Sequence, residues 1–354
     1  MSVPSVLSAR PVKLAVMGAG LIGRRHIQHI LAEPDTELMA VVDPTEAGRG
    51  VAAQAGAPWF ESLRDLLAAD RPDGVIIATP NQVHVENALE AVAAGVPALI
   101  EKPIADDLAE GERLVAVAED AGVSILVGHH RRHNPIMRAA REIVASGRLG
   151  RIVAVNALFW LYKPDDYFDL SWRREPGAGP VLVNLIHDVD NLRYLLGEVA
   201  AVQAVESNAV RAHAVEETSA IILEFASGAL ATASVCDTAV APWSWEMTTG
   251  ENPAYPFADE ACYILAGTAG SLSLPKLEIW TNEGKPGWWE PFRRTRLGIA
   301  PKDPLALQIR HFAEVIRGNE TPLVSGREGL RTLEVITAVK QAAQTGQRVR
   351  LKSA

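Results

Sequence analysis

The feature that most constrains the fold is a glycine pattern near the start of the chain. Gly18, Gly20 and Gly23 form a G-x-G-x-x-G motif that directly follows the apolar run 12–17 and precedes the helix-like segment 24–32. Between a strand and a helix, the first glycine allows a tight turn, the second lets the backbone approach a pyrophosphate, and the third lets the helix pack on the strand. The helix N-terminus adds N–H groups for phosphate oxygens. The pattern predicts a dinucleotide-binding unit.

An acidic residue follows the second strand-like run. That run, 37–42, ends at Asp43, which lies 20 residues after Gly23. In dinucleotide-binding folds an acid at this spacing binds the adenosine ribose of NAD, and its charge repels the 2′-phosphate of NADP. We therefore predict NAD as the cofactor, with NADP less favoured. Arg49 is the nearby basic residue that an NADP site would use.

Strand-like and helix-like segments alternate along the first third of the chain. Short apolar runs end at Ala78, Ile100 and Val127, and helical patterns lie between them. This alternation is typical of a parallel sheet covered by helices, with ligands bound at the carboxyl ends of the strands. We predict a doubly wound Rossmann domain over residues 1–128.

The pattern changes in the remainder of the chain. Strand-like runs rich in Val, Ala and Thr recur, and the segment 226–228 between two of them is typical of a hairpin. One helix near 187–196 interrupts these runs, and helices at 305–317 and 327–345 close the chain. We predict an α+β domain with a large open, mostly antiparallel sheet over residues 129–354. The last helix could also pack on the first domain.

Length and composition exclude several classes of function. At 354 residues the chain suits two domains, and its net charge of −9 argues against nucleic acid as a partner, because phosphate backbones require a concentrated basic surface. No apolar run approaches the roughly 18 residues of a membrane span, and residues 1–10 lack the pattern of a signal peptide. Cys236 and Cys262 fit a reducing compartment. We therefore expect a cytoplasmic protein that contacts neither membranes nor nucleic acid.

Three further motifs follow predicted strands or precede a helix. In chain order they are Thr79-Pro80-Asn81 with His84, Glu101-Lys102-Pro103, and Gly177-Ala178-Gly179 leading to His187 and Asp190. Together with the glycine motif and Asp43, they resemble the glucose-fructose oxidoreductase/inositol dehydrogenase family, known as Gfo/Idh/MocA. The resemblance covers essentially the whole chain, and Glu-Lys-Pro after the fourth strand is its most specific element.

The resemblance implies a fold, an activity and an assembly. Relatives have an N-terminal Rossmann domain and a C-terminal open-sheet domain, which binds the substrate and joins the subunits into a homodimer or homotetramer. They oxidise or reduce sugars, polyols and related hydroxy compounds with NAD(P), and in them the bond before Pro103 is cis. The cofactor contacts assigned by spacing and resemblance together are Gly18, Gly20, Leu21, Ile22, Gly23, Asp43, Thr79, Pro80, Asn81, His84, Glu101 and Lys102.

Lys102 is the first catalytic candidate. At the end of the fourth strand it is a cation at the nicotinamide end of the cofactor, where it can orient the substrate hydroxyl and help to take up its proton. A neighbouring nicotinamide cation would lower the pKa of the Lys102 ammonium group, since like charge disfavours the protonated form. The alternative is an ordinary surface lysine in a strand-to-helix loop.

His187 is the second catalytic candidate, as a proton acceptor. It begins a predicted helix after the glycine-rich segment, and the ordinary pKa of histidine suits proton transfer near neutrality. In the inositol dehydrogenase pattern an aspartate stands four residues earlier, but here that position is Val183, with Asn184 as the nearest polar group. A Lys-Asp-His triad is therefore not available. The alternative role for His187 is that of a buried structural histidine, and Asp190 could likewise be structural.

The remaining candidates carry weaker signals. For Thr79, Pro80, Asn81 and His84 the alternative is turn chemistry with an N-cap, and Asn81 could both cap a helix and line the cofactor channel. The run 129–134 is rich in His and Arg, but nothing completes a metal shell, so we predict no metal and favour a polar floor for cofactor and substrate over a solvated run. Loop aromatics such as Trp172, with Lys163 among their polar neighbours, could bind a sugar, fill the core or contact another subunit. The predicted substrate contacts are Lys102, Arg131, His133, Asn134, Trp172, Arg173, Asn184 and His187.

Together, these motifs predict an NAD-dependent dehydrogenase that oxidises a hydroxyl of a sugar, polyol or related cyclic hydroxy compound. Two alternatives stay open: a glycoside hydrolase that uses NAD for transient oxidation, and a catalytically inactive NAD-sensing regulator on the same fold. A phosphorylating aldehyde dehydrogenase is disfavoured, because neither cysteine lies in a recognisable nucleophile setting.

Overall fold

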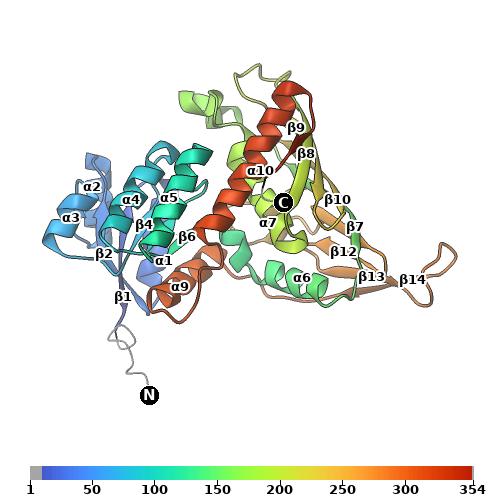
Figure 1. Cartoon of the computed structure of the whole chain (residues 1–354), viewed down its shortest axis with the longest axis horizontal. Helices are drawn as coiled ribbons and strands as arrows, with labels where there is room; N and C mark the ends of the chain where they lie inside the picture. The colour runs from blue at the N-terminus through green and yellow to red at the C-terminus, as the bar shows by residue number, and fades with distance from the viewer. Residues whose placement is uncertain (1–9, 353–354) are drawn as a thin grey trace. The chain divides into compact units, whose positions relative to one another are not determined.

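The computed structural model describes residues 10–352, which form two compact units (Figure 1). The first unit contains the described residues up to His133 and the later segment Pro304–Leu333, and the second contains Asn134–Asp303 and the residues from Glu334 on. The sequence analysis divided the chain after residue 128 and assigned all that follows to the second domain. The structure differs because the chain returns to the first unit near its end. Among residues 10–352, no helix combines the length and the apolar character that crossing a membrane requires.

The first unit is built on a six-stranded parallel sheet with the order β3-β2-β1-β4-β5-β6. Its strands are β1 (Val12–Met17), β2 (Thr36–Val42), β3 (Trp59–Phe60), β4 (Gly74–Ile77), β5 (Ala98–Ile100) and β6 (Ile125–Val127). Its helices are α1 (Leu21–Ala32), α2 (Glu46–Ala55), α3 (Leu63–Ala69), α4 (His84–Ala93), α5 (Leu108–Asp120), α9 (Pro304–Ile316) and the first part of α10 (Gly326–Thr345). The inner strands are almost completely buried, as expected for a parallel sheet covered on both faces. The predicted Rossmann fold is confirmed.

The strand order reverses between β1 and β4. From β1 the chain proceeds outward through β2 and β3, and from β4 it proceeds outward in the other direction through β5 and β6. Sheets of this kind bind ligands in the crevice at the carboxyl ends of the strands where the order reverses. The glycine turn follows β1 and the Thr79 turn follows β4, so the fold brings both to this edge.

Helix α9 explains why a late segment belongs to the first unit. Its residues Ile309 and Phe312 are buried in the core that surrounds the parallel sheet. A Cβ added at Gly74, the first residue of β4, would lie 2.5 Å from Ile316 and 3.2 Å from Phe312, so the helix packs tightly against this strand. Leu333 of α10 joins the same core. The start of the last helix therefore packs on the first domain, which the sequence had left open.

The second unit is built on a nine-stranded sheet with the order β14-β13-β12-β11-β7-β10-β9-β8-β15. Neighbouring strands are antiparallel except β7 and β10, which are parallel. The strands are β7 (Ile152–Trp160), β8 (Val199–Ser207), β9 (Thr218–Phe225), β10 (Leu230–Cys236), β11 (Tyr263–Gly267), β12 (Ser271–Leu274), β13 (Glu278–Asn282), β14 (Phe292–Arg296) and β15 (Val349–Arg350). The helices are α6 (Pro135–Ala145), α7 (Ile186–Leu196), α8 (Trp245–Thr249) and the rest of α10. The predicted open, mostly antiparallel sheet is confirmed.

One face of this sheet carries exposed side chains. Residues at paired positions on five neighbouring strands point to the same side, and all of them are exposed. In strand order they are Gln203, Ile222, Thr232, Asn156 and Ile264. Within the described part of the second unit, no helix covers this row.

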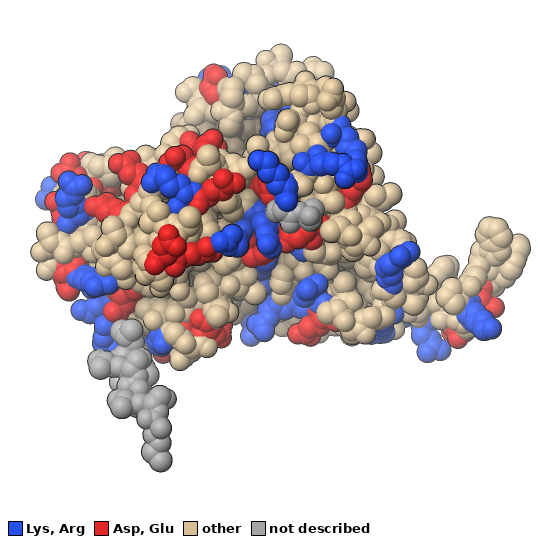
Figure 2. All heavy atoms as spheres, viewed as in Figure 1, with Lys and Arg blue, Asp and Glu red and all other residues tan. Residues whose placement is uncertain are grey.

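Strands β13 and β14 form a hairpin that projects beyond the rest of the sheet (Figure 1). Its turn carries two exposed tryptophans, Trp288 and Trp289, and the space-filling view shows mostly uncharged surface at its far end (Figure 2). The sequence analysis did not predict this hairpin. Strand β14 consists largely of arginine, so it lacks the apolar alternation by which a strand is recognised.

Candidate active site

The glycine turn between β1 and α1 has the geometry that a pyrophosphate site requires. Gly18 has a φ of +87°, and a Cβ there would lie 2.5 Å from the carbonyl oxygen of Ala78. A Cβ at Gly23 would lie 1.9 Å from the carbonyl oxygen of Gly18. At Gly20, by contrast, a Cβ would have no protein atom within 4 Å. Packing therefore requires the two outer glycines, whereas Gly20 leaves open space for a ligand.

The N-terminus of α1 is open to an anion. Gly20 is the N-cap residue and has no side chain that could bond the first N–H groups of the helix, including those of Leu21 and Ile22. Other helices of this unit are capped by side chains, namely those of Thr45, Ser62 and Asp107. Uncapped N–H groups and the positive end of the helix dipole bind phosphate oxygens. The residues present therefore fit the predicted dinucleotide.

Asp43 lies at the end of β2 and bonds the glycine turn. Its Oδ2 accepts the N–H of Ala19 at 2.8 Å, and its Oδ1 accepts the N–H of Thr45 at 2.9 Å and the Thr45 hydroxyl. A carboxylate has about four lone-pair positions, so acceptor capacity remains for a ribose hydroxyl. The guanidinium of Arg49 stacks over the ring of Trp59, with its carbon 5.5 Å from the ring centroid.

His84 joins the turn after β4 to the turn after β5. Its Nδ1 lies 2.8 Å from the carbonyl oxygen of Pro103, and its Nε2 lies 2.9 Å from that of Thr79. Burial lowers the pKa of His84, against the raising effect of the two carbonyl groups. The imidazole therefore positions two loops that carry predicted site residues, and its direct contact with the cofactor stays a prediction.

The short turn after β4 contains Thr79, Pro80 and Asn81. Asn81 begins the 3₁₀ turn η2 (Asn81–Val83), and the N-cap of α4 is Val83, which makes no side-chain cap bond. The alternative in which Asn81 caps the helix is therefore wrong. The Thr79 hydroxyl accepts a hydrogen bond from the Asn87 amide at 3.0 Å.

Glu101 is buried and paired with α1. Its Oε1 lies 2.7 Å from Nε2 of His26. Burial alone would raise the pKa of Glu101, but the hydrogen bond and charge of His26, together with the nearby cations, lower it to about 2. A Cβ at Gly128 would lie 2.9 Å from Oε2 of Glu101, so a glycine is required beside it. The carboxylate thus joins β5 to the helix of the glycine turn, and its contact with the cofactor stays a prediction.

Lys102 follows Glu101 at the carboxyl end of β5 and is partly exposed. The Lys102–Pro103 bond is cis, as the resemblance implied. The strand order places this residue on the same edge of the sheet as the glycine turn and the Thr79 turn.

The run 129–134 is buried for the most part, so the alternative of a solvated run is wrong. Arg131 and His133 are both buried. Arg132 forms an ion pair with Glu328 at 3.0 Å, and the ring of His133 lies 5.0 Å from that of His311. Within residues 10–352, no group of three His, Cys, Asp or Glu side chains is arranged to hold a metal ion.

Asn134, the last residue of this run, is also buried and uses both ends of its amide. Its Oδ1 accepts the N–H of Ile136 at 2.8 Å and so caps α6, and its Nδ2 donates to Glu251 at 2.7 Å. The geometry assigns Asn134 to the helix cap. Substrate contacts by Asn134, Arg131 and His133 stay predictions.

His187 lies near the start of α7, directly after a π-helical turn, η6 (Val181–Leu185). The sequence analysis expected the glycine-rich segment to lead into a helix that begins at His187, so the helical segment begins earlier than predicted. Oε1 of Glu216 accepts the N–H of Val181 at 2.9 Å, and a Cβ at Gly179 would lie 2.2 Å from the same oxygen. This contact fixes the start of the turn. π-Helical turns occur frequently at functional sites.

The surroundings of His187 are mostly buried. His187 itself has little exposure, Asp190 is fully buried, and Asp188 accepts the hydroxyl of Tyr263. The structure therefore keeps both interpretations of His187 open, as a proton acceptor and as a structural residue.

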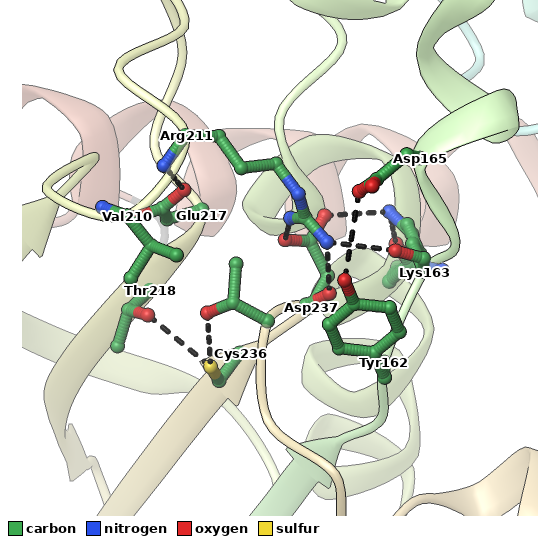
Figure 3. Close-up of polar contacts among 11 residues, drawn as sticks. Tyr162, Lys163, Asp165, Val210, Arg211, Glu217, Thr218, Cys236 and Asp237 are labelled. Carbon is green, nitrogen blue, oxygen red and sulfur yellow. Dashed lines mark hydrogen bonds and ion pairs between the residues drawn. The ribbon is translucent and has the colours of Figure 1, made fainter.

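Lys163, Asp237 and Arg211 form a charged cluster beyond the ends of β7 and β10 (Figure 3). Nζ of Lys163 lies 3.1 Å from Oδ2 of Asp237, and Nη1 of Arg211 donates to Oδ1 of Asp237 at 2.7 Å. Nζ of Lys163 also donates to Oδ1 of Asn184 at 2.8 Å. The sequence analysis named Lys163 only as one of several polar neighbours of the loop aromatics. Lys163 follows β7 and Asp237 follows β10, and the parallel pairing of these two strands brings the two residues together, whereas Arg211 comes from the connection between β8 and β9.

Trp172 and Arg173 lie in the 3₁₀ turn η5 (Ser171–Arg174). The guanidinium of Arg173 stacks on the ring of Tyr167, 4.0 Å from its centroid, and donates to the carbonyl oxygen of Tyr167 at 2.7 Å. Trp172 is exposed, so it does not fill the core. Its contact with a substrate stays a prediction.

Two family models match this chain. Residues 12–129 match the oxidoreductase family with an NAD-binding Rossmann fold, and residues 137–273 match the GFO/IDH/MocA C-terminal domain. The chain belongs to the Gfo/Idh/MocA oxidoreductase family. The resemblance on which the sequence analysis relied is confirmed.

The similarity to known proteins extends over almost the whole chain. The chain is 27% identical to 1,5-anhydro-D-fructose reductase of Ensifer adhaerens, across 96% of this chain and 98% of that protein. It is 26% identical to scyllo-inositol 2-dehydrogenase (NAD(+)) of Bacillus subtilis, across 96% of each. The structure of the WlbA dehydrogenase from Bordetella pertussis, in complex with NADH and UDP-GlcNAcA, has a TM-score of 0.79 at 26% identity and covers 97% of this chain and 99% of its own. This Gfo/Idh/MocA protein is an oxidoreductase with an NAD-binding Rossmann fold.

Proposed function

We propose that this protein oxidises a hydroxyl of a sugar, polyol or related cyclic hydroxy compound with NAD. The observation that carries the proposal is the open phosphate cradle at Gly20, with Lys102 on the same edge of the sheet. NAD supplies the hydride acceptor when it is bound. Residues of the chain bind NAD, orient the substrate and accept the proton of its hydroxyl group. The reductase and dehydrogenase names of the relatives support this reaction class.

Lys102 and His187 have different roles in this proposal. The ammonium group of Lys102 donates a hydrogen bond to the substrate hydroxyl oxygen and stabilises the negative charge that develops there. The neutral imidazole of His187 accepts the hydroxyl proton. Val183 stands at the position of the family's aspartate, so no carboxylate at that position assists the histidine.

The experiment that tests the function is a substrate panel. Formation of NADH is followed with inositols, aldoses and sugar acids, and the NADH formed is compared with the amount of oxidised product. We expect one NADH for each product molecule. Product without net NADH would support the glycoside hydrolase alternative instead, and no turnover across the panel with NAD bound would support the inactive regulator.

The preferred cofactor in this proposal is NAD rather than NADP. The Asp43 carboxylate at the end of β2 would repel a 2′-phosphate, and Arg49 is stacked on Trp59 and lies 3.9 Å from Glu46. We expect kcat/KM with NAD to exceed that with NADP by at least about tenfold. Asp43→Ser should lower the ratio of kcat/KM with NAD to kcat/KM with NADP. The variant loses the carboxylate that would bind the ribose hydroxyl of NAD, and each hydrogen bond to a charged group contributes about 1.5–3 kcal/mol. Equal use of both cofactors by the wild type would show that Asp43 does not select between them.

The proposal includes a homodimer or homotetramer in the cytoplasm. The exposed row on the nine-stranded sheet, which includes Ile222 and Ile264, supports contact between copies of the chain. The small number of cysteines supports a reducing compartment. Fractionation of the producing cells tests the location.

A further inference from the structure

The carboxylate of Glu101 bonds both to the helix of the glycine turn and to the backbone of Lys102. Oε1 of Glu101 lies 2.7 Å from Nε2 of His26 on α1. Oε2 of the same carboxylate accepts the backbone N–H of Lys102 at 3.3 Å. Because the pKa of Glu101 is about 2, the carboxylate is ionised near neutral pH. One side chain therefore connects His26 to the peptide group of Lys102.

The ring proton of His26 lies on the nitrogen that faces Glu101. An ionised carboxylate can only accept a hydrogen bond, so Nε2 is the donor. The imidazole is fully buried, and within residues 10–352 its Nδ1 has no hydrogen-bond partner. The hydrogen bond to Glu101 is thus the polar contact that accounts for a histidine at this position.

Stability of the fold alone does not explain a buried histidine on this face of α1. The other buried residues of the helix are Gly23, Ile27 and Ile30. A buried polar pair seldom stabilises a fold more than apolar side chains of similar volume would, and such pairs can instead fix one specific arrangement. The arrangement that this pair fixes includes Lys102, which directly follows Glu101.

The residues on either side of Lys102 have little room to move. A Cβ added at Gly128 would lie 2.9 Å from Oε2 of Glu101 and 3.0 Å from its Cα. After Lys102, the carbonyl oxygen of Pro103 lies 2.8 Å from Nδ1 of His84. Lys102 itself is partly exposed, so its side chain extends out of a buried and tightly packed segment. The direction in which the side chain starts therefore depends on how its neighbours are held.

We propose that His26 is a positioning residue for the reaction: through Glu101 it holds the peptide group of Lys102, so that the ammonium group is directed at the substrate hydroxyl. This inference rests on the proposed function, in which Lys102 donates a hydrogen bond to the hydroxyl oxygen. A small displacement of such a group lowers the rate strongly, so loss of the link should affect turnover more than cofactor binding.

Three variants on α1 test the role of His26. His26→Leu removes the donor and keeps a side chain of similar volume, so kcat with the best substrate of the panel should fall at least about tenfold, while the Kd of NADH changes less than about threefold. His26→Gln places an amide N–H near the position of Nε2 and should recover most of kcat. Ile30→Ala, at a fully buried residue one turn further on, is the matched control.

Ile30→Ala should destabilise the unit and keep kcat near the wild-type value, because a cavity at this position does not break the pair. Thermal unfolding shows whether His26→Leu is folded and how its stability compares with that of the control. A folded His26→Leu protein with the kcat of the wild type overturns the proposal.

Combination with Lys102→Ala separates positioning from a general structural effect. If His26 acts through Lys102, then His26→Leu should lower the residual kcat of Lys102→Ala less than about twofold, since the two changes are not additive. A loss of kcat by the same factor in the wild type and in the Lys102→Ala protein overturns the proposal.

Hydrogen exchange at the backbone N–H of Lys102 gives a readout that does not depend on turnover. Measured by mass spectrometry with fragmentation to single residues, this exchange should be at least about tenfold faster in His26→Leu than in the wild type or in Ile30→Ala. Unchanged exchange at Lys102 overturns the proposal.

The results separate this inference from the proposed function. Formation of NADH by the wild type, together with an unchanged kcat in His26→Leu, would overturn the inference and leave the function in place. Faster exchange at Lys102 in His26→Leu, without NADH formation by the wild type from any compound of the panel, would support the link and contradict the dehydrogenase activity.

Discussion

At the scale of single residues, Lys102 and Lys13 are two partly exposed lysines at opposite ends of the same parallel sheet. Lys102 follows the carboxyl end of β5, whereas Lys13 lies near the start of β1, 3.8 Å from Asp70. We expect Lys102→Ala to lower turnover by at least about a hundredfold, the usual scale for an acid–base group, while NADH binding is retained. Lys13→Ala should change neither turnover nor NADH binding. Steady-state kinetics and NADH titrations measure both effects, and near-normal turnover of Lys102→Ala would exclude a catalytic role.

The pair of Glu101 and His26 predicts a loss of stability in acid. The pKa of Glu101 is about 2 in the folded chain, below the ordinary value of 4.5, so the unfolded state binds the proton more tightly. The ionised carboxylate therefore stabilises the fold fully above about pH 4.5, and this contribution is lost as the pH falls toward 2. Glu101→Gln breaks the pair and should lower the free energy of unfolding at pH 7 by about 3–5 kcal/mol.

Urea unfolding of Glu101→Gln and wild type at several pH values measures this effect. The difference between the two proteins should be largest at pH 7 and shrink below about pH 4.5. A difference that stays constant down to pH 3 would show that the ionised carboxylate does not cause it.

At the scale of elements, the N-terminus of α1 has no side-chain cap and adjoins the glycine turn, and the glycines there predict two separable effects. Gly20→Ala meets no protein atom within 4 Å, so we expect the fold to be retained and NADH to bind at least about tenfold more weakly, because the new methyl group occupies the ligand space. Gly23→Ala would place its Cβ 1.9 Å from a carbonyl oxygen and should destabilise the domain.

Gly50→Ala is the matched control for these two glycine variants. Gly50 lies inside α2 with open space around it, so alanine there should raise the free energy of unfolding by about 0.5–1 kcal/mol and leave NADH binding unchanged. Thermal unfolding and NADH titration distinguish the three variants. Unchanged NADH affinity in Gly20→Ala would show that the pyrophosphate does not approach this turn.

The turn before His187 is an element that a distant carboxylate holds in place. Glu216 accepts the N–H of Val181, and Oε2 of the same side chain lies 2.6 Å from Nζ of Lys340 on α10. The glycine at position 179 is required because a side chain would collide with Glu216. The position of His187 therefore depends on packing with residues that lie far from it along the chain.

At the scale of the whole molecule, the exposed row on the nine-stranded sheet predicts self-association. Ile222 and Ile264 are 42% and 44% exposed, and a lysine at each position would place charge on this face. We expect the wild type to have a solution mass that is a multiple of the chain mass, and Ile222→Lys with Ile264→Lys to have the mass of a single chain. Light scattering coupled to size-exclusion chromatography measures both.

Val117 on α5 provides the control for this face, because it is 41% exposed and lies in the first unit. Val117→Lys should leave the mass unchanged. Circular dichroism should show the same fold in all three proteins. A wild type of single-chain mass, or a double variant that keeps the oligomeric mass, would show that the sheet face does not join the subunits.

The sequence by itself determined the cofactor-binding sheet, because the signals for it are local. Gly18, Gly20 and Gly23 lie within six consecutive positions, and Asp43 follows the very next strand. Strong apolar runs separated by helices define parallel strands without knowledge of distant contacts. Glu101-Lys102-Pro103 was found in the same way, since three adjacent residues at a strand end form a recognisable pattern.

Only the tertiary structure decided how residues from distant segments meet. Lys163 contacts Asp237 because β7 and β10 are parallel neighbours, and no local periodicity encodes which strands pair. The return of α9 to the first core depends on contacts of Ile309 and Phe312 with strands that lie far from them along the chain. Likewise, the π-helical turn before His187 is anchored by Glu216, 35 residues further along the chain. Strand order and long-range hydrogen bonds determine these contacts. The contacts stabilise the protein only once the whole chain is folded, so no short segment of sequence encodes them.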